Sequence, residues 1–521
     1  MNLGHLKNKN LFGSDMLLPD FLRDDDICSI IKNEVIPLIN LEELEPMYKE
    51  GGRPPISPII LLVVTLLQYI ECLTDRTASF NLRYRLDWKI ALGLELEDEG
   101  IHFSTLHVFR NRLIEHDKAS FLFDRILEHL VAKGLIQKSE KQRIDSTHVV
   151  GNVRELSRLE LISETLRLFC KNANSFSSQM DEFLLSQLAK FSEKMSSYKM
   201  SKEDRKSEIQ NMGKVMKAFI TWAESSDRKK ISLSDSFKTL KIVYEQNFDD
   251  NSDDTLPELI KVSTGKGHIC SPHETEARFA NKGGKSWIGY KAQIAETVTD
   301  KENKSETNFI TYAEVNEATD YDGNIVEDYI TSQESIKTVP EEVYADTHYN
   351  NENNIKNLLS KDIDLKGPVM PAPPENRTQE KNRGFKINPS KEKVTCPAGD
   401  ESIRFSYKSQ GHVSATFSKD SCQKCFRKNI CKPEPRGKVI LIRGESELLA
   451  GRREQMKTNE YKVDMYHRNG IEGTISGLVR GQEMRRSKYR GIDKTRLQIK
   501  FSATAANIKR LISHYEWKKQ A

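Results

Sequence analysis

The pattern of hydrophobic and polar positions predicts mainly helices, joined by tight turns, between residues 18 and 118. After a Gly51–Pro55 turn, Ser57 and Pro58 form a good N-cap and first-turn pair for an apolar helix that extends to Tyr69. Ser104 predicts the cap of another helix, over Thr105–Glu115. Short helices of this kind suit a helix-turn-helix-like DNA-binding module, and a plain helical bundle fits the same pattern equally well.

The helix predicted at Thr105–Glu115 is amphipathic. Its apolar residues share one face, and two arginines stand on the flanks of that face. The apolar residues are Leu106, Phe109 and Leu113, and the arginines are Arg110 and Arg112.

Beyond this helical part, short runs of β-branched and apolar residues predict strands. The first strand is Gln142–Val150, and a helical block from Glu155 to about Phe248 follows it. A period of two then predicts neighbouring strands at Trp287–Ala295 and Asn308–Val315, joined by a charged turn at Asp300–Ser305. The helical block therefore separates the first strand from the next two.

Three further elements follow these strands. They are a helix at Asn324–Ile336, a short buried strand at Glu342–Asp346 and a helix at Glu352–Leu359. The order of strands and helices implies an α/β fold, with a mixed sheet that carries helices on its faces.

A proline-rich stretch and a basic, loop-rich region come next, before the chain becomes helical again. A helix that begins near residue 464 carries four polar residues at intervals of four, hence on one stripe. These residues are Arg468, Glu472, Ser476 and Arg480. A last helix is predicted over Lys494–His514.

Composition narrows the class of protein. The 521 residues are 37% hydrophobic and 30% charged, which is typical of a globular chain, and the length favours two or three domains. The longest apolar run, Ile59–Leu67, is too short to cross a bilayer, and the first residues lack a signal-peptide pattern. We therefore expect a cytoplasmic protein with no membrane partner.

The net charge of +4 does not by itself indicate a nucleic-acid partner, but the charge is unevenly distributed. Basic residues concentrate between Arg480 and Arg510, where they form a phosphate-sized electrostatic footprint. A solvated helix face is the simpler explanation of this feature taken alone. The side chains predicted to contact DNA are Arg468, Arg480, Arg485, Arg486, Lys488 and Arg490.

Two aspartates lie in or directly after short apolar runs, where a charge is costly unless it is paired or bound to metal. Their contexts are similar: Ile144–His148 reads Ile-Asp-Ser-Thr-His, and Ala345–His348 reads Ala-Asp-Thr-His. A single buried aspartate is more often a cap or an ion-pair partner. Because Asp145 and Asp346 share a context, we interpret both as functional, and His148 and His348 as ordinary polar neighbours.

Two strand-end aspartates and a helical glutamate are the ligands that two-metal phosphoryl chemistry requires. We predict Asp145, Asp346 and Glu472 as catalytic residues that bind two Mg²⁺ or Mn²⁺ ions. Such a pair of ions stabilises the attacking and leaving oxygens of an in-line displacement.

Eight cysteines divide into a cluster and four scattered residues. The cluster is Cys396, Cys422, Cys425 and Cys431, and the scattered thiols are Cys28, Cys72, Cys170 and Cys270. A Cys-x-x-Cys knuckle with two further cysteines matches a structural Zn²⁺ site. Reduced, metal-free cysteines are the alternative, because only one half of the cluster shows paired spacing.

With these motifs the chain resembles the DDE transposases of bacterial insertion sequences, in the branch with a Tyr, Arg, Glu, Lys signature. Gly52–Pro58 and the residues to about Glu115 look like the N-terminal domain of that group, Asp145–Thr147 and Ala345–Thr347 like its two aspartate motifs, and Arg468–Thr474 like its glutamate motif. The signature departs in two places. Met465 stands where tyrosine is usual, with Tyr466 one step late, and Val479 stands where lysine is usual, with Arg480 as its candidate substitute.

The resemblance implies an RNase H-like sheet flanked by helices, with a large insertion ahead of the glutamate helix. The predicted parts are a helical DNA-binding domain at 1–135, a core at 136–154 and 266–375, a helical insertion at 155–265, a Cys-rich insertion at 376–460, and the catalytic helix with a basic helical region at 461–521. The implied partner is double-stranded DNA, both the inverted repeats at the ends of the element and the target. A homodimer on DNA is expected, because two ends must be held together.

The implied activity is metal-dependent cleavage and strand transfer of an insertion sequence. Two alternatives stay open: an RNase H-like nuclease that cuts without joining, and a transposase-derived DNA-binding protein whose chemistry has decayed. The second alternative predicts a lost acid, and all three candidate acids are intact.

Overall fold

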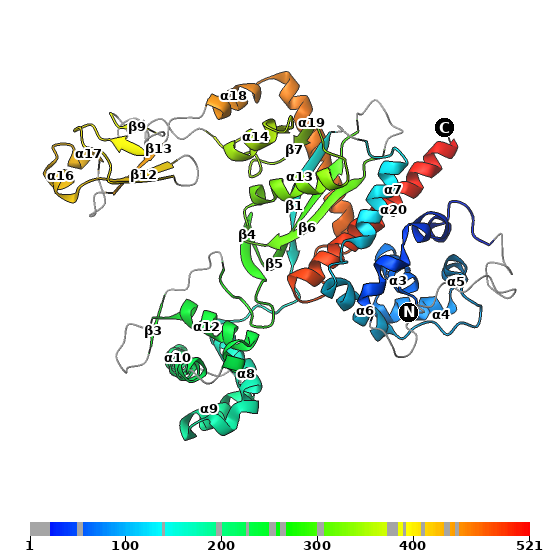
Figure 1. Cartoon of the computed structure of the whole chain (residues 1–521), viewed down its shortest axis with the longest axis horizontal. Helices are drawn as coiled ribbons and strands as arrows, with labels where there is room; N and C mark the ends of the chain where they lie inside the picture. The colour runs from blue at the N-terminus through cyan, green and yellow to red at the C-terminus, as the bar shows by residue number, and fades with distance from the viewer. Residues whose placement is uncertain are drawn as a thin grey trace. The chain divides into compact units, whose positions relative to one another are not determined.

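The computed structural model describes residues 21–48, 56–137, 141–193, 201–225, 229–249, 257–260, 267–299, 307–371, 384–388, 392–407, 412–431, 438–442 and 447–520. The turns predicted at Gly51–Pro55 and Asp300–Ser305 lie outside these residues. The chain divides into two compact units, and Figure 1 labels the helices and strands of the chain. The first is Met1–Glu342 with Asn469–Ala521, and the second is Val343–Arg468.

The N-terminal part of the first unit is helical, as the pattern predicts. Its longer helices are α3 (Pro58–Ile70), α4 (Asp75–Tyr84), α5 (Leu86–Leu92), α6 (Phe103–Glu115) and α7 (Phe121–Ala132), after a short α2 (Ile27–Ile30). Ser57 is the N-cap residue of α3 but forms no side-chain cap hydrogen bond. The prediction of Ser104 as a cap was wrong. The N-cap of α6 is His102, whose ring accepts a hydrogen bond from the Ser104 N–H.

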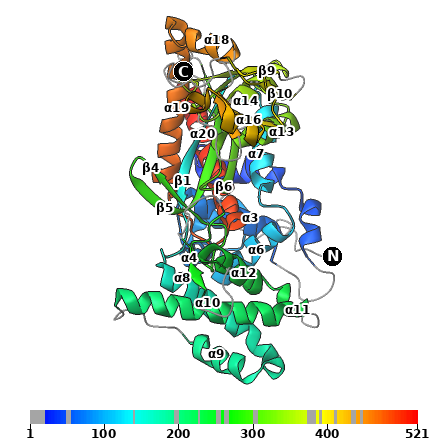
Figure 2. The same ribbon diagram turned by 90° about the vertical axis from the view of Figure 1, so that its left-hand side faces the viewer.

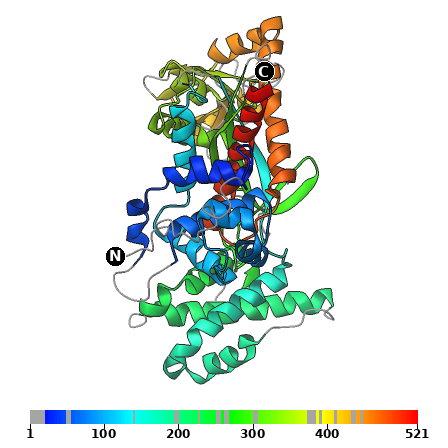
Figure 3. The ribbon, with the colours of Figure 1, turned by 90° about the vertical axis from the view of Figure 1, so that its right-hand side faces the viewer.

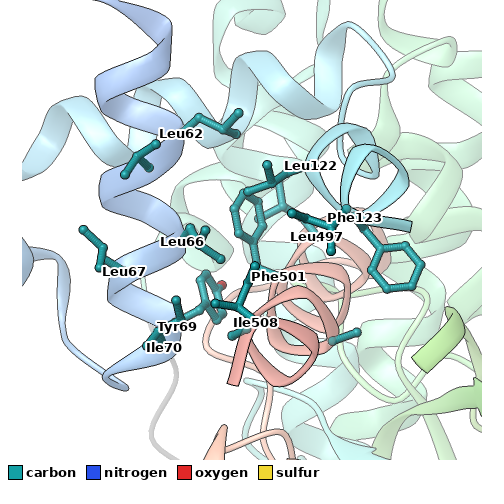
Figure 4. Close-up of a cluster of buried hydrophobic side chains, with 14 of the residues drawn as sticks. Leu62, Leu66, Leu67, Tyr69, Ile70, Leu122, Phe123, Leu497, Phe501 and Ile508 are labelled. Atoms are coloured by element: carbon teal, nitrogen blue, oxygen red, sulfur yellow. The ribbon is translucent and has the colours of Figure 1, made fainter. Parts of the chain in front are cut away.

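One hydrophobic core joins these helices to the last helix of the chain, α20 (Ile492–Gln520). Figure 4 shows the contact, where side chains of α3 and α7 gather around those of α20. Tyr69 stacks on Phe501 with the ring centroids 5.3 Å apart. The N-terminal helices therefore fold against the C-terminus of the chain, and burial of these apolar side chains stabilises the contact.

The sheet of the first unit is built from β1 (Gln142–Val150), β4 (Arg278–Lys282), β5 (Lys285–Thr297) and β6 (Ile310–Glu317). The long β5 pairs antiparallel with each of the other three. Strand β1 was predicted at these bounds, whereas β4 was not predicted. The residues of α20 cover β6, and the Asn507 amide bonds both the N–H and the carbonyl of Ile310 at the start of that strand.

The helices between β1 and β4 have a hydrophobic core of their own. They are α8 (Arg158–Ala173), α9 (Glu182–Ser192), α10 (Lys202–Glu224), α11 (Lys229–Ser232) and α12 (Asp235–Asn247). Figure 2 shows the long α10 running across this group. Phe169 lies in the core, with its ring centroid 5.3 Å from that of Phe219. The predicted helical block is thus present, and its apolar faces pack on one another.

The helix that carries Glu472 is α19 (Asn459–Gly481), which begins in the second unit and ends in the first. Its end runs beside α20 (Figure 3), and Thr474 of α19 accepts a hydrogen bond from Arg510 of α20 at 2.6 Å. Both helices extend beyond their predicted starts at residues 464 and 494.

The second unit contains the short strands β7 (Glu342–Tyr344, whose first residue belongs to the first unit) and β8 (Asp364–Lys366), which pair with each other, and α14 (Glu352–Leu359). A Cys-rich part follows, with β9 (Lys386–Asn388), β10 (Lys393–Thr395), β11 (Arg404–Tyr407), β12 (His412–Thr416), α16 (Lys419–Lys424), α17 (Lys428–Cys431) and β13 (Lys438–Ile442). Helix α18 (Glu447–Gln455) leads into α19.

Among the described residues, no single helix is long and apolar enough to cross a membrane. Helices α3 and α4 pass such a test of length and composition only as a pair, bent by 113°.

Candidate active site and nucleic-acid interface

Asp145 lies in the middle of β1, opposite Ile294 of β5. The β-branched residues around it favour an extended backbone, and its neighbour Ile144 is buried. The Asp145 side chain is half-buried, and its Oδ1 accepts the Ser146 N–H at 2.7 Å. The ligand role of Asp145 stays a prediction.

Glu472 lies on α19 and is exposed. Ile471, Thr474 and Leu478, at helical spacing around it, are buried, and they fix the face that α19 turns to the core. The carboxylate of Glu472 therefore stands on the solvent side of a helix whose other side is anchored.

Asp346 belongs to the second unit, two residues after the end of β7. Its Oδ1 accepts the Thr347 N–H at 2.6 Å. The Asn350 amide donates to the carbonyls of Ala345 and Asp346, at 3.1 Å in both cases. These bonds fix the turn, so the half-buried Asp346 carboxylate has a defined place.

Arg468, predicted to position DNA phosphate, forms an ion pair with Asp346, with 3.9 Å between Nη2 and Oδ2. One turn earlier on α19, Asp464 forms an ion pair with Lys366 of β8 at 3.3 Å. Both contacts lie within the second unit. They attach this part of α19 to β8 and to the turn that carries Asp346.

The three predicted acids are distributed over the two units. Asp145 and Glu472 lie in the first, and Asp346 lies in the second. In the part of the chain that the structure describes, no three His, Cys, Asp or Glu side chains are arranged as a metal site requires. The common metal site of the three acids stays a prediction.

The basic residues after α19 differ in their surroundings. Arg485 is half-buried, and its Nη1 donates to the Thr147 hydroxyl at 3.1 Å and to the His148 carbonyl at 2.9 Å. The main chain beside it also bonds the end of β1, because Val150 donates to the Arg485 carbonyl and accepts from the Ser487 N–H. This segment therefore extends the sheet, and Arg485 has a structural role besides any contact with DNA.

The remaining predicted DNA contacts divide in the same way. Lys488 is half-buried, 3.2 Å from Glu483 and over the ring of Tyr69. The exposed members are Arg480, Arg486 and Arg490. The exposed arginines are thus the better candidates for phosphate contacts.

The two arginines of α6 have different surroundings. Arg110 was predicted on the flank of α6, but it is buried, with 4% of its side chain exposed, and it forms an ion pair with Asp75 at 2.6 Å. Burial opposes the charge of Asp75, but the hydrogen bond and charge of Arg110 outweigh it and lower the pKa of Asp75. Arg112 lies over the Tyr48 ring. Arg110 therefore links α4 to α6 and is not available to DNA.

All four clustered cysteines line one small cavity, of about 30 Å³, in the second unit. The turn after Cys396 is closed by the Gly399 N–H, which donates to the Cys396 carbonyl, and Gly399 has the left-handed φ of 96° that favours glycine. Cys425 Sγ accepts the Arg427 N–H at 3.5 Å. Burial raises the pKa of the Cys422 thiol, and the three other thiols raise it further. The thiols thus converge without reaching a metal-binding arrangement.

Comparison with known families finds two matches to transposase domains, one in the N-terminal part of the chain and one in the C-terminal part. A model described as a transposase DDE domain matches residues 395–512, and a model described as a transposase domain (DUF772) matches residues 18–112. These matches support an insertion-sequence transposase. The first covers the Cys cluster, Glu472 and α20 as far as residue 512, and the second covers the N-terminal helices as far as residue 112 in α6. Asp145 and Asp346 lie outside both matches. Comparison with curated proteins found no match, and comparison with solved structures found none.

Proposed function

We propose that this transposase cuts the ends of an insertion sequence and joins them to target DNA, through an RNase H-like core with Asp145, Asp346 and Glu472 as its catalytic acids. The observation that carries the proposal is the pair of transposase-domain matches, one of which covers Glu472 and its helix. The twin contexts of Asp145 and Asp346 support the assignment of the other two acids.

The family implies dependence on a divalent metal, and the donor set fits Mg²⁺ or Mn²⁺, because all three candidate ligands are carboxylates. Two such ions would stabilise the attacking and leaving oxygens at the scissile phosphate. The three carboxylates lie on a strand, on a turn that follows a strand, and on a helix. Arg468 and the exposed Arg480, Arg486 and Arg490 would bind phosphates, with Arg485 and Lys488 supporting them. We expect two copies on DNA, since both ends must be cut and joined together.

Cleavage of labelled end DNA in Mg²⁺ tests the acids one by one. We expect Asp145→Asn, Asp346→Asn and Glu472→Gln each to lower the rate on the order of a thousandfold, because each removes a metal ligand. Glu460→Gln is the matched control, an exposed glutamate in the first turn of the same helix. Undiminished cutting by one of the three variants would remove that residue from the assignment.

A target plasmid in the same reaction separates the alternatives. Joined products support transposition, whereas cut ends that never join the plasmid support a nuclease without strand transfer. Binding of end DNA without cutting, in Mg²⁺ and in Mn²⁺, supports a decayed DNA-binding protein.

We also propose a structural Zn²⁺ at Cys396, Cys422, Cys425 and Cys431, supported by their position around one cavity. Thiolates are the preferred ligands of zinc, and the described residues of this part of the chain form a small hydrophobic cluster. We expect about one zinc per chain by elemental analysis of the purified protein, lost in Cys422→Ser and kept in Cys270→Ser. A wild-type chain without zinc, even after refolding with the metal, would contradict the site.

A further inference from the structure

A fully buried carboxylate connects the elements that carry two of the proposed acids. Glu296, near the end of β5, has 0% of its side chain exposed. Its Oε1 accepts a hydrogen bond from Nε of Arg143 of β1 at 2.8 Å and forms an ion pair with Nη2 of the same arginine at 2.7 Å. Its Oε2 accepts from the Thr474 hydroxyl of α19 at 2.6 Å and from Arg510 Nη1 of α20 at 2.8 Å. Four elements thus meet at one side chain.

The cluster is closed by further bonds. Arg510 Nη2 donates to the Thr474 hydroxyl at 2.6 Å, and Nη1 donates to the Asn308 carbonyl at 2.9 Å. The Thr474 hydroxyl therefore donates to one member of the cluster and accepts from another. Such a network is directional, because each bond prescribes an angle as well as a distance.

The cluster contacts α19 on both sides of Glu472. Thr474 lies two residues after it, and Gly470 lies two residues before it. At Gly470 a Cβ atom would come within 2.0 Å of the Arg143 guanidinium, so the helix and the arginine are in direct contact there. On β1, Arg143 lies two residues before Asp145, on the same face of the strand. The contacts at 470 and 474 fix the height and the rotation of the helix turn that carries Glu472.

A hydrophobic cluster at this place would stabilise the fold at a lower desolvation cost than a carboxylate with two arginines. Apolar contacts, however, are non-directional and would let the helix slide or turn. From this geometry we infer that Glu296 and Thr474 are positioning residues, which hold Glu472 in register with Asp145 for metal binding. The inference rests on the proposed function and deepens it.

The test uses a substitution that keeps the shape of the core. Thr474→Val removes the hydroxyl at nearly constant volume, and Thr474→Ser retains it. Thr504→Val is the matched control, since Thr504 is a buried threonine on the neighbouring α20 whose hydroxyl donates to the Lys500 carbonyl of its own helix. For each full-length protein, Mn²⁺ binding is measured by electron paramagnetic resonance, and end cleavage is measured over a range of Mn²⁺ concentrations.

We expect Thr474→Val to weaken Mn²⁺ binding about tenfold and to lower the cleavage rate at saturating end DNA by a similar factor, with unchanged affinity for that DNA. Thr474→Ser should restore both, and Thr504→Val should leave both unchanged. A Thr474→Val protein that is less heat-stable but has wild-type Mn²⁺ dependence would overturn the inference. If Mn²⁺ binding is lost in Asp145→Asn but the wild-type protein cuts no DNA, the result contradicts the proposed function alone.

Discussion

His148 of β1 is surrounded by cations. Its Nδ1 lies 2.8 Å from Arg485 Nη1, and its ring lies beside that of Trp287. Burial lowers the pKa of His148, and the charges of Arg485, Lys282 and Lys285 lower it further. The folded protein therefore holds this imidazole neutral at a pH where the unfolded chain, with an ordinary pKa of about 6.5, takes up a proton.

A histidine whose pKa is lower in the folded protein than in the unfolded chain stabilises the fold at pH values above the unfolded-chain pKa. This stabilisation is lost as the pH falls below that pKa. We therefore predict that the wild-type protein loses thermal stability between pH 7.5 and pH 5.5 and that His148→Gln loses less. Thermal midpoints of both proteins at the two pH values measure this difference. Equal losses would show that His148 does not contribute to the pH dependence.

The sequence indicated Asp145 and Asp346 because a charge that follows an apolar run is costly in both places. Glu296 also follows two apolar residues, Ile294 and Ala295, yet it lacks the Thr-His context that distinguished the aspartates. What the sequence cannot show is that Arg143 and Arg510 neutralise it. A partner that is distant along the chain becomes known only when the fold is known.

At the scale of elements, local patterns predicted β1 and α14 at their observed bounds, because period and capping residues are encoded within a few positions. They failed where tertiary contact decides. Strand β4 has a polar, half-exposed sequence and pairs only because β5 extends beyond β1. Arg110 lies on the buried face of α6 because Asp75 neutralises it there.

Helix α19 gives a prediction at this scale, because its glycines differ in their surroundings. Gly470 meets the Arg143 guanidinium, which could move aside as the far end of a flexible side chain if Glu296 did not hold it. Nothing lies within 4 Å of the Cβ position at Gly477. In an otherwise open helix, Gly→Ala stabilises by up to about 1 kcal/mol.

We therefore predict that the same substitution, glycine to alanine, has opposite effects on stability at these two positions. Gly477→Ala should raise the midpoint of urea unfolding slightly, whereas Gly470→Ala should lower it and reduce end cleavage as Thr474→Val does. If Gly470→Ala were as stable and as active as Gly477→Ala, the close contact between α19 and Arg143 would not constrain the helix.

At the scale of the whole molecule, two hydrophobic clusters among the described residues of the first unit have separate members. One joins the N-terminal helices, the sheet and α20, and the other lies within the α8–α12 block. The sequence predicted both the block and its position after the first strand, because its amphipathic helices are local features. It did not predict that α3 and α7 pack on α20, because the apolar face of a helix does not indicate which distant helix will pack against it.

Two clusters with separate members predict two cooperative units of unfolding. Phe169→Ala removes a fully buried ring from the core of the block and should destabilise that block by about 3–5 kcal/mol. Hydrogen exchange should then accelerate in α8 and α12 and stay unchanged in α20. Phe501→Ala is the matched substitution in the other cluster and should accelerate exchange in α3 and α20 instead. If either variant accelerated exchange equally in both sets of helices, the two clusters would unfold together. The α8–α12 block would then be a part of the first unit that does not fold on its own contacts.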